Sequence, residues 1–143
     1  MIQVATDWFI PLRINSQKQG EVFKEYSVTW TPTMVVLDAE GKENCRFTGF
    51  FTPPELCARM ILDGAKAEIN LENFSLAIKC FDDILEKYPG TFAAPEAIFY
   101  SGVAKYLSSH EPKVLKKGLL QLRKEFPDSE WTARAKPYEL IGD

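Results

Sequence analysis

The segment Thr52-Pro53-Pro54-Glu55 limits the possible folds of this chain most strongly, because it combines several signals for the start of a helix. A threonine can cap the first turn, and a proline at the first helical position has no N–H to leave unsatisfied. A glutamate three residues after the threonine completes a capping box. Short apolar runs and turns precede this segment, whereas helical periodicity follows it. We therefore predict two domains, residues 1–57 with strands and residues 58–143 with helices only.

The helical part has apolar residues in steps of three and four, the spacing of helices that bury one face. Pro89-Gly90 ends one such stripe, and new stripes begin near Pro95-Glu96 and Pro112. A short fifth helix is predicted after Asp128-Ser129. The apolar stripes comprise residues 56, 60, 61 and 65, residues 71, 74, 78, 81, 85 and 88, and residues 99, 103, 106, 107, 115, 119, 122, 126, 131, 135 and 138.

The helical part also repeats itself, since residues 86–91 are echoed by residues 124–129. The spacing of Ala77, Phe81, Ile84 and Pro89 recurs in Leu115, Leu119, Leu122 and Pro127. On these residues, the segment 58–137 resembles divergent tetratricopeptide repeats, which implies stacked antiparallel helical hairpins. Gly102 and Tyr106 lie about one residue away from the first-helix positions of that motif, so the second unit is imperfect.

The first part of the chain has the pattern of alternating strands and helices. Residues 10–14 alternate apolar and other side chains, which predicts a half-buried strand, and Pro11 makes it an edge strand. Ser16 and Gln19 have capping-box spacing, so a helix is predicted to start there. The run 34–38 is apolar enough for a strand buried on both faces, and the turn residues 39–42 join it to a second strand at 43–49 as a hairpin.

These elements, taken in order, resemble the second half of a thioredoxin-like domain over about residues 9–62. The resemblance rests on the segments 22–28, 31–37 and 46–50, together with Gly41. It implies a cis Thr31–Pro32 bond. It also implies that a loop of Trp30, Thr31, Pro32 and Thr33 offers backbone groups to an extended peptide. The alternative interpretation is a simple turn before a strand.

The chain departs from that family in having no Cys-x-x-Cys pair, and only residues 1–8 precede the first predicted strand. Dithiol exchange needs an activated thiolate beside a resolving thiol, so we expect no catalytic residue in the chain as it stands. In the family a further strand lies between residues 10–14 and 34–37. Its absence would leave an open sheet edge, through which we expect a homodimer to form.

Composition excludes several classes of function. The net charge is −3, which argues against a nucleic-acid-binding surface. No apolar run approaches the roughly 20 residues of a membrane span, and residues 1–7 do not form a secretory signal. We therefore expect a cytoplasmic protein.

Three isolated cysteines and one histidine give no basis for a metal or another cofactor. Cys45, Cys57 and Cys80 are widely spaced, and His110 has no partner at ligand spacing. A Cys45–Cys57 bridge is an alternative to three free thiols, which a reducing compartment would favour. One cluster of basic residues is interpreted as a solvated face rather than as a clamp for an acidic peptide, and it comprises Lys113, Lys116, Lys117, Arg123 and Lys124.

A second cluster is aromatic and is interpreted mostly as core rather than as a ligand cage. It comprises Tyr88, Phe99, Tyr100, Tyr106, Phe126 and Trp131.

The predicted fold class is α/β plus α, with an incomplete thioredoxin-like β-α-β-β-α unit packed on helical hairpins similar to tetratricopeptide repeats. The first functional hypothesis is a non-catalytic interaction module that binds a protein or peptide through the Pro32 loop or the hairpin groove. The second is a truncated thiol-disulfide oxidoreductase whose Cys-x-x-Cys lies upstream of Met1. Both hypotheses predict the same fold for these residues.

Overall fold

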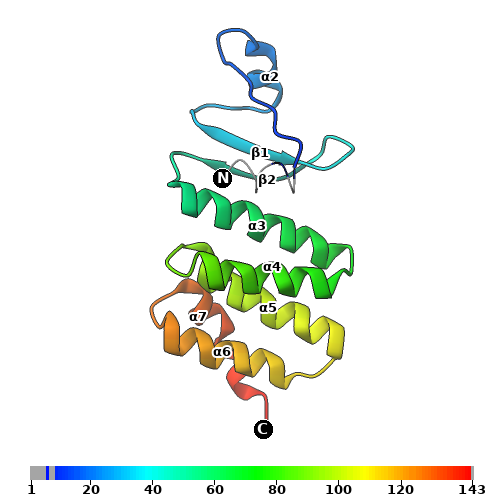
Figure 1. Ribbon diagram of the computed structural model, residues 1–143, viewed down its shortest axis with the longest axis vertical. Coiled ribbons are helices and arrows are strands. Elements are labelled where there is room, and N and C mark those ends of the chain that lie inside the picture. Colours follow the sequence, from blue (N-terminus) through cyan, green and yellow to red (C-terminus); the bar gives the residue numbers. More distant parts are fainter. Residues whose placement is uncertain (1–5, 7–8, 143) are drawn as a thin grey trace.

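The computed structural model describes residue 6 and residues 9–142, in which a small two-stranded sheet is followed by a stack of helices (Figure 1). The first elements are α2 (Gly20–Glu25), β1 (Thr33–Leu37) and β2 (Glu43–Thr48). The helical part comprises α3 (Pro53–Asn70), α4 (Phe74–Lys87), α5 (Ala93–Ser109), α6 (Lys113–Glu125), α7 (Glu130–Ala135) and the short 3-10 helix η1 (Lys136–Leu140). The prediction of a strand hairpin followed by helices alone is confirmed for the described residues.

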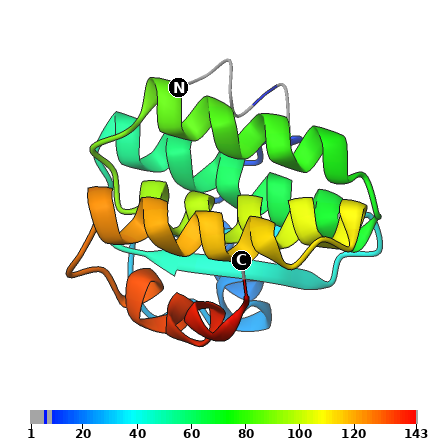
Figure 2. The same cartoon turned by 90° about the horizontal axis from the view of Figure 1, so that it is seen from below.

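The helices from α3 to α6 pack one against the next, and α3 also contacts α5. Viewed from below, the β1–β2 sheet and α7 lie toward the same side of this stack, and α4 lies toward the other (Figure 2). Among the described residues, no helix is both long and apolar enough to cross a bilayer.

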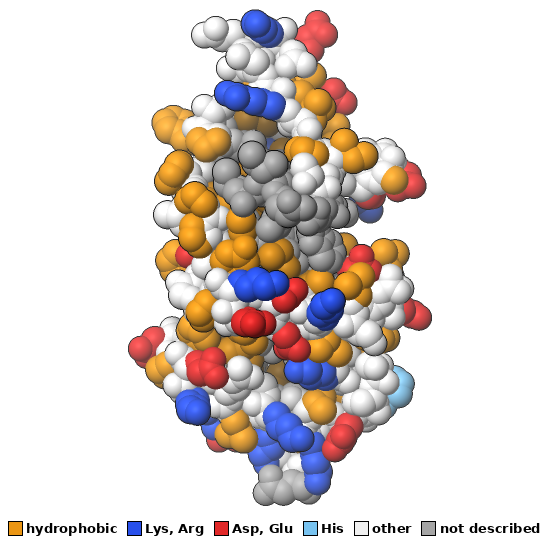
Figure 3. All heavy atoms as spheres, in the orientation of Figure 1, with side chains coloured by type: hydrophobic (Ala, Val, Ile, Leu, Met, Phe, Trp, Pro, Cys, Tyr) orange, Lys and Arg blue, Asp and Glu red, His pale blue; other side chains and the backbone are white. Residues whose placement is uncertain are grey.

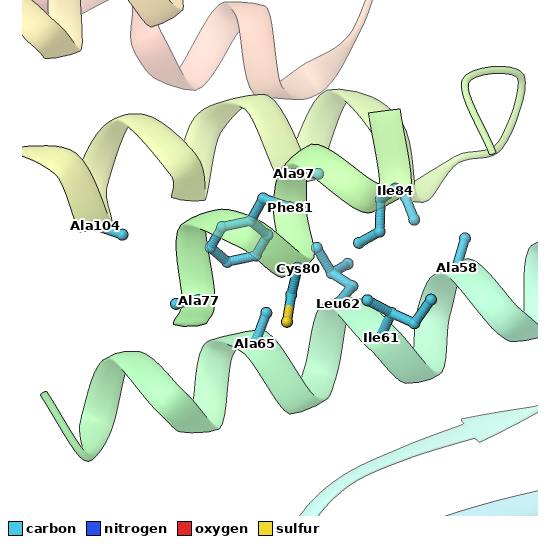
Figure 4. Close-up of a cluster of buried hydrophobic side chains, with 11 residues drawn as sticks. Ala58, Ile61, Leu62, Ala65, Ala77, Cys80, Phe81, Ile84, Ala97 and Ala104 are labelled. Carbon is cyan, nitrogen blue, oxygen red and sulfur yellow. The ribbon is translucent and has the colours of Figure 1, made fainter. Parts of the chain in front are cut away.

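Small side chains allow the helices to approach closely in the core. In the main core cluster, five alanines of α3, α4 and α5 have no exposed surface, and they surround the larger buried side chains of Leu62, Phe81 and Ile84 (Figure 4). The Phe81 ring also stacks on Tyr100, with the ring centroids 6.4 Å apart. A second cluster of Ile98, Leu119, Leu122 and Ala135 joins α5 and α6 to α7. The five alanines are Ala58, Ala65, Ala77, Ala97 and Ala104.

The sheet of the described chain has two antiparallel strands, in which Thr33 pairs with Thr48 and Val36 with Cys45. The pairing is irregular between Val36 and Leu37. The strand predicted at residues 34–38 is confirmed as β1, but the prediction that it is buried on both faces was wrong, because Thr33–Val36 are only half-buried and Leu37 is exposed. The faces of a strand are buried by layers packed above and below the sheet, and within the described chain β1 contacts β2 far more than any helix.

The strand predicted at residues 10–14 is absent, and these residues have no regular structure. Ile10 is 98% exposed and Leu12 is 82% exposed. Alternation of apolar side chains produces a strand only where a neighbour can pair with it and a packed surface can bury one face. Between residues 9 and 142, β1 and β2 pair only with each other, so this segment has no strand partner.

Two predicted capping boxes form different contacts from those expected. The helix predicted from Ser16 begins at Gly20, because Asn15 rather than Ser16 exchanges hydrogen bonds with the following turn. The Asn15 N–H donates to the Gln19 side chain at 3.1 Å. The helix α3 starts at Pro53 as predicted, but the Thr52 side chain makes no capping hydrogen bond. The Glu55 carboxylate instead accepts from the backbone N–H of Phe92, at 3.2 and 3.3 Å.

Replacing Leu122 by alanine should lower the free energy of unfolding by about 2–5 kcal/mol, because its side chain is fully buried in the second cluster. Leu120, two residues away on the same helix, is 55% exposed and provides a matched control. Leu120→Ala should change the same quantity by less than about 0.5 kcal/mol. Urea unfolding followed by circular dichroism measures both, and equal losses would contradict the described packing of α6.

Candidate functional site

The loop of Trp30, Thr31, Pro32 and Thr33 connects α2 to β1 and lies on the surface. The Thr31–Pro32 peptide bond is cis, as the resemblance implies. Trp30 is 69% exposed, and Thr31 and Pro32 are exposed as well. The loop therefore offers one large apolar side chain to the solvent at the start of β1.

Hydrogen bonds on both sides hold this loop against β2. The Thr33 hydroxyl donates to the Trp30 carbonyl at 2.7 Å, and its oxygen lies 3.1 Å from the Thr48 hydroxyl oxygen. The Gly49 N–H donates to the Pro32 carbonyl at 2.8 Å. Gly49 has a φ of 109°, a backbone conformation that would be strained for a residue with a side chain. This conformation explains why glycine stands at a position that the sequence comparison assigned to the family pattern.

Arg46 fastens the end of α2 to the sheet, a role that sequence reasoning did not identify. Its guanidinium donates to the Tyr26 carbonyl at 2.7 Å and to both carboxylate oxygens of Glu43 at 2.6 and 2.7 Å. The hydrogen bond from Arg46 lowers the pKa of Glu43. A lone arginine in a strand gives no sequence signal for such a contact, because the acceptor carbonyl belongs to a segment 20 residues away.

The second edge of β1 has no strand partner among the residues that the structure describes. In an antiparallel pair, alternate residues of each strand direct their N–H and C=O groups away from the partner strand. Such an unpaired edge is a template for another extended chain. In the space-filling view, hydrophobic side chains gather at the level of the sheet and the start of α3, whereas lysines and arginines gather over α6 (Figure 3).

The three thiols are free, so the alternative of a Cys45–Cys57 bridge was wrong. Burial raises the pKa of Cys45 to about 12, and the nearby Asp63 carboxylate, which accepts a hydrogen bond from the thiol at 3.3 Å, adds to this effect. Burial likewise raises the pKa of Cys80 to about 11. These shifts oppose thiolate formation, which is the reverse of what a redox nucleophile needs.

The other singled-out residues have structural contacts. The His110 N–H donates to the Tyr106 carbonyl at 2.7 Å and ends α5 in the left-handed conformation. Phe99, Tyr100 and Trp131 lie in one aromatic cluster. Within the described part of the chain, no group of three or more His, Cys, Asp or Glu residues could hold a metal ion.

Partly buried ion pairs join α3 to α5, and the sequence interpretation missed them. Glu96 is 6% exposed and accepts from Lys66 at 2.9 Å and from Arg59 at 3.4 Å. Arg59 also donates to Asp63 at 3.0 Å, one turn along α3. In the sequence, the four-residue spacing of Arg59 and Asp63 was the only signal for these ion pairs. Glu96 lies 37 residues after Arg59, on another helix.

Residues 3–62 match the model of a family described as a thioredoxin-like domain. The match extends over the Pro32 loop, the hairpin and the first half of α3, and the described chain beyond it is helical. No family match identifies tetratricopeptide repeats in the helical region. No significant match was found among curated proteins or among solved structures. The predicted boundary between residues 57 and 58 lies inside α3 and stays a prediction.

The thiols should react slowly with Ellman's reagent at pH 8 in the folded chain. The raised pKa of about 12 lowers the thiolate fraction of Cys45 by roughly a thousandfold relative to its usual value of 9.0. In concentrated urea burial is lost, so all three cysteines should react as fast as glutathione, which serves as the reference thiol. Stopped-flow absorbance measures the rates. A thiol that reacts in the folded chain at the rate of glutathione would contradict this account of the site.

Proposed function

We propose that this chain is a non-catalytic interaction module that binds an extended peptide along the Trp30–Thr33 loop and the adjoining edge of β1. The observation that carries the proposal is the second edge of β1, which begins directly at this loop and has no strand partner among residues 9–142. A peptide laid along the edge would add a strand to the sheet. Its main-chain hydrogen bonds would supply affinity, and its alternate side chains would supply specificity.

The Trp30 indole gives such a peptide an apolar anchor. Large exposed aromatic side chains often dominate the energy of protein interfaces. The Thr33 hydroxyl donates to the Trp30 carbonyl, and the Pro32 carbonyl accepts from the N–H of Gly49 directly after β2. The backbone beside Trp30 is thus already ordered, so binding would order little additional backbone. The hairpin therefore presents a pre-organised rather than a disordered surface.

The same edge would accept a second copy of the chain, and we propose that a homodimer forms through it at high concentration. Pairing of two β1 edges would satisfy the outward backbone groups of both copies. Peptide and second copy would then compete, because both use the same hydrogen-bonding groups.

The second candidate, part of a thiol-disulfide oxidoreductase whose Cys-x-x-Cys precedes Met1, is favoured by the thioredoxin-like match. In that case the loop would hold a peptide for a dithiol outside this sequence. In-frame translation of the coding region upstream of Met1 separates the two candidates, since a Cys-x-x-Cys there would favour the oxidoreductase and a stop codon would favour the interaction module. Insulin reduction tests what both candidates share, because this chain alone should give no rate above the dithiothreitol blank.

Trp30→Ala should weaken binding of a capped, fluorescein-labelled peptide of alternating valine and threonine by about 5- to 30-fold, because it removes the apolar anchor but leaves the strand edge. Fluorescence anisotropy measures the affinity. The matched control is Phe50→Ala, since Phe50 is 85% exposed on the chain segment after β2, outside the Pro32 loop. This variant should bind like the original chain.

Equal binding by the Trp30→Ala chain and the original chain would contradict the proposed site, as would a lack of any binding. Light scattering provides the second readout. The average mass should rise over about 10–100 µM chain and fall when the peptide is added. A constant monomer mass would refute the dimer and leave the peptide result to decide the function.

A further inference from the structure

A groove on the helical part lies apart from the Pro32 loop and is formed where three chain segments meet. These segments are the start of α3, the turn between α4 and α5, and the start of α7. The groove has a volume of about 600 Å³, within the range of roughly 300–1,000 Å³ typical of ligand sites. Its apolar walls are the side chains of Phe51, Phe92, Phe126 and Trp131.

Most charged side chains that line this groove already form ion pairs within the chain. Arg59 contacts the carboxylates of Asp63 and Glu96, and Lys66 supplies the second cation to Glu96. At the α7 rim, Glu130 pairs with Arg134 at 3.6 Å. Each carboxylate of these pairs therefore has a cationic partner.

Glu55 is the exception among the carboxylates that line the groove. Its two oxygens accept from the backbone N–H of Phe92, and no described lysine or arginine lies within 4.0 Å of them. The hydrogen bond places this carboxylate beside Phe92, which is 89% exposed. Among the described residues, Glu55 is thus the one carboxylate lining the groove that has no lysine or arginine partner, and it lies next to the exposed Phe92.

Two contacts in the chain show a cation that binds an aromatic ring and a carboxylate at the same time. The Lys66 ammonium lies 4.9 Å from the centre of the Tyr100 ring while it pairs with Glu96. The Arg134 guanidinium lies 4.6 Å from the centre of the Trp131 ring while it pairs with Glu130. In both places a cation is shared by an aromatic ring and a carboxylate, an arrangement that combines cation–π and ionic attraction.

We propose that this groove binds a peptide segment in which one lysine or arginine is flanked by large apolar side chains. The cation would pair with Glu55 against the Phe92 ring, and the apolar neighbours would contact Phe51 and Trp131. An acidic peptide fits less well, since its charge would meet Glu55 while Arg59 is occupied by two carboxylates. The groove is a second peptide site, independent of the β1 edge.

The test uses the full chain and three capped octapeptides that differ at one central position, which is lysine, glutamine or glutamate between leucine and phenylalanine. The lysine peptide should bind most tightly and should shift the backbone amide signals of Phe92 and Glu130 in two-dimensional ¹H–¹⁵N spectra. Trp30 and the β1 amides should keep their positions, which separates this site from the one proposed for the extended peptide.

Glu55→Gln keeps an oxygen that can accept from the Phe92 N–H but removes the charge. It should weaken binding of the lysine peptide about threefold and abolish the preference over the glutamine peptide. Phe92→Ala should weaken it about two- to fivefold. The charge-matched control is Glu21→Gln on the exposed side of α2, outside the groove, which should bind like the original chain.

Three results would overturn the proposal. The first is equal affinity for the lysine and glutamate peptides, and the second is unchanged affinity in both groove variants. The third is a dimer in which the groove amide signals are already shifted and which the peptide dissociates. That result would assign the groove to a second copy of the chain.

Discussion

The helix α3 is the element on which the rest of the structure depends, because it is shared by the sheet and the helical stack. One face carries Ala58, Leu62 and Ala65 into the core against α4. Another directs Arg59 and Asp63 toward Glu96 of α5 and toward the Cys45 thiol of β2. A two-stranded hairpin is marginally stable alone, so its attachment to a helix with a large core makes a persistent small sheet possible.

The helix α3 therefore supports the sheet from one side. Within the described chain, the second edge of β1 has no strand partner. Hydrogen bonds from Gly49 and Thr33 fix the loop, and Arg46 ties the end of α2 to the sheet. These contacts define the surface without completing the ladder of β1. In the described part of the chain, the thioredoxin-like region thus combines a hydrogen-bonded loop with a strand edge that has no strand partner. The helical stack adds a separate aromatic groove near the start of α3.

Patterns that act within one element were sufficient to predict the helices from the sequence. The steps of three and four that place Phe81 and Leu122 inside are confirmed, and so is the helix start at Pro53. The strand at residues 10–14 failed because alternation does not specify a partner strand. The contacts of Glu55 with Phe92 and of Glu96 with Lys66 join residues 37 and 30 positions apart, and no local pattern contains such pairings.

The central claim is that the second edge of β1 is available for binding, and hydrogen exchange of its backbone amides tests this most directly. In the dilute free chain, the core amides of α4 and α5 should exchange slowly, whereas the outward-facing amides of β1 should exchange nearly as fast as in an unfolded peptide. Addition of the alternating valine–threonine peptide should slow these same β1 amides. Slow exchange at every β1 amide in the free monomer would show that the edge is already paired and would contradict the account.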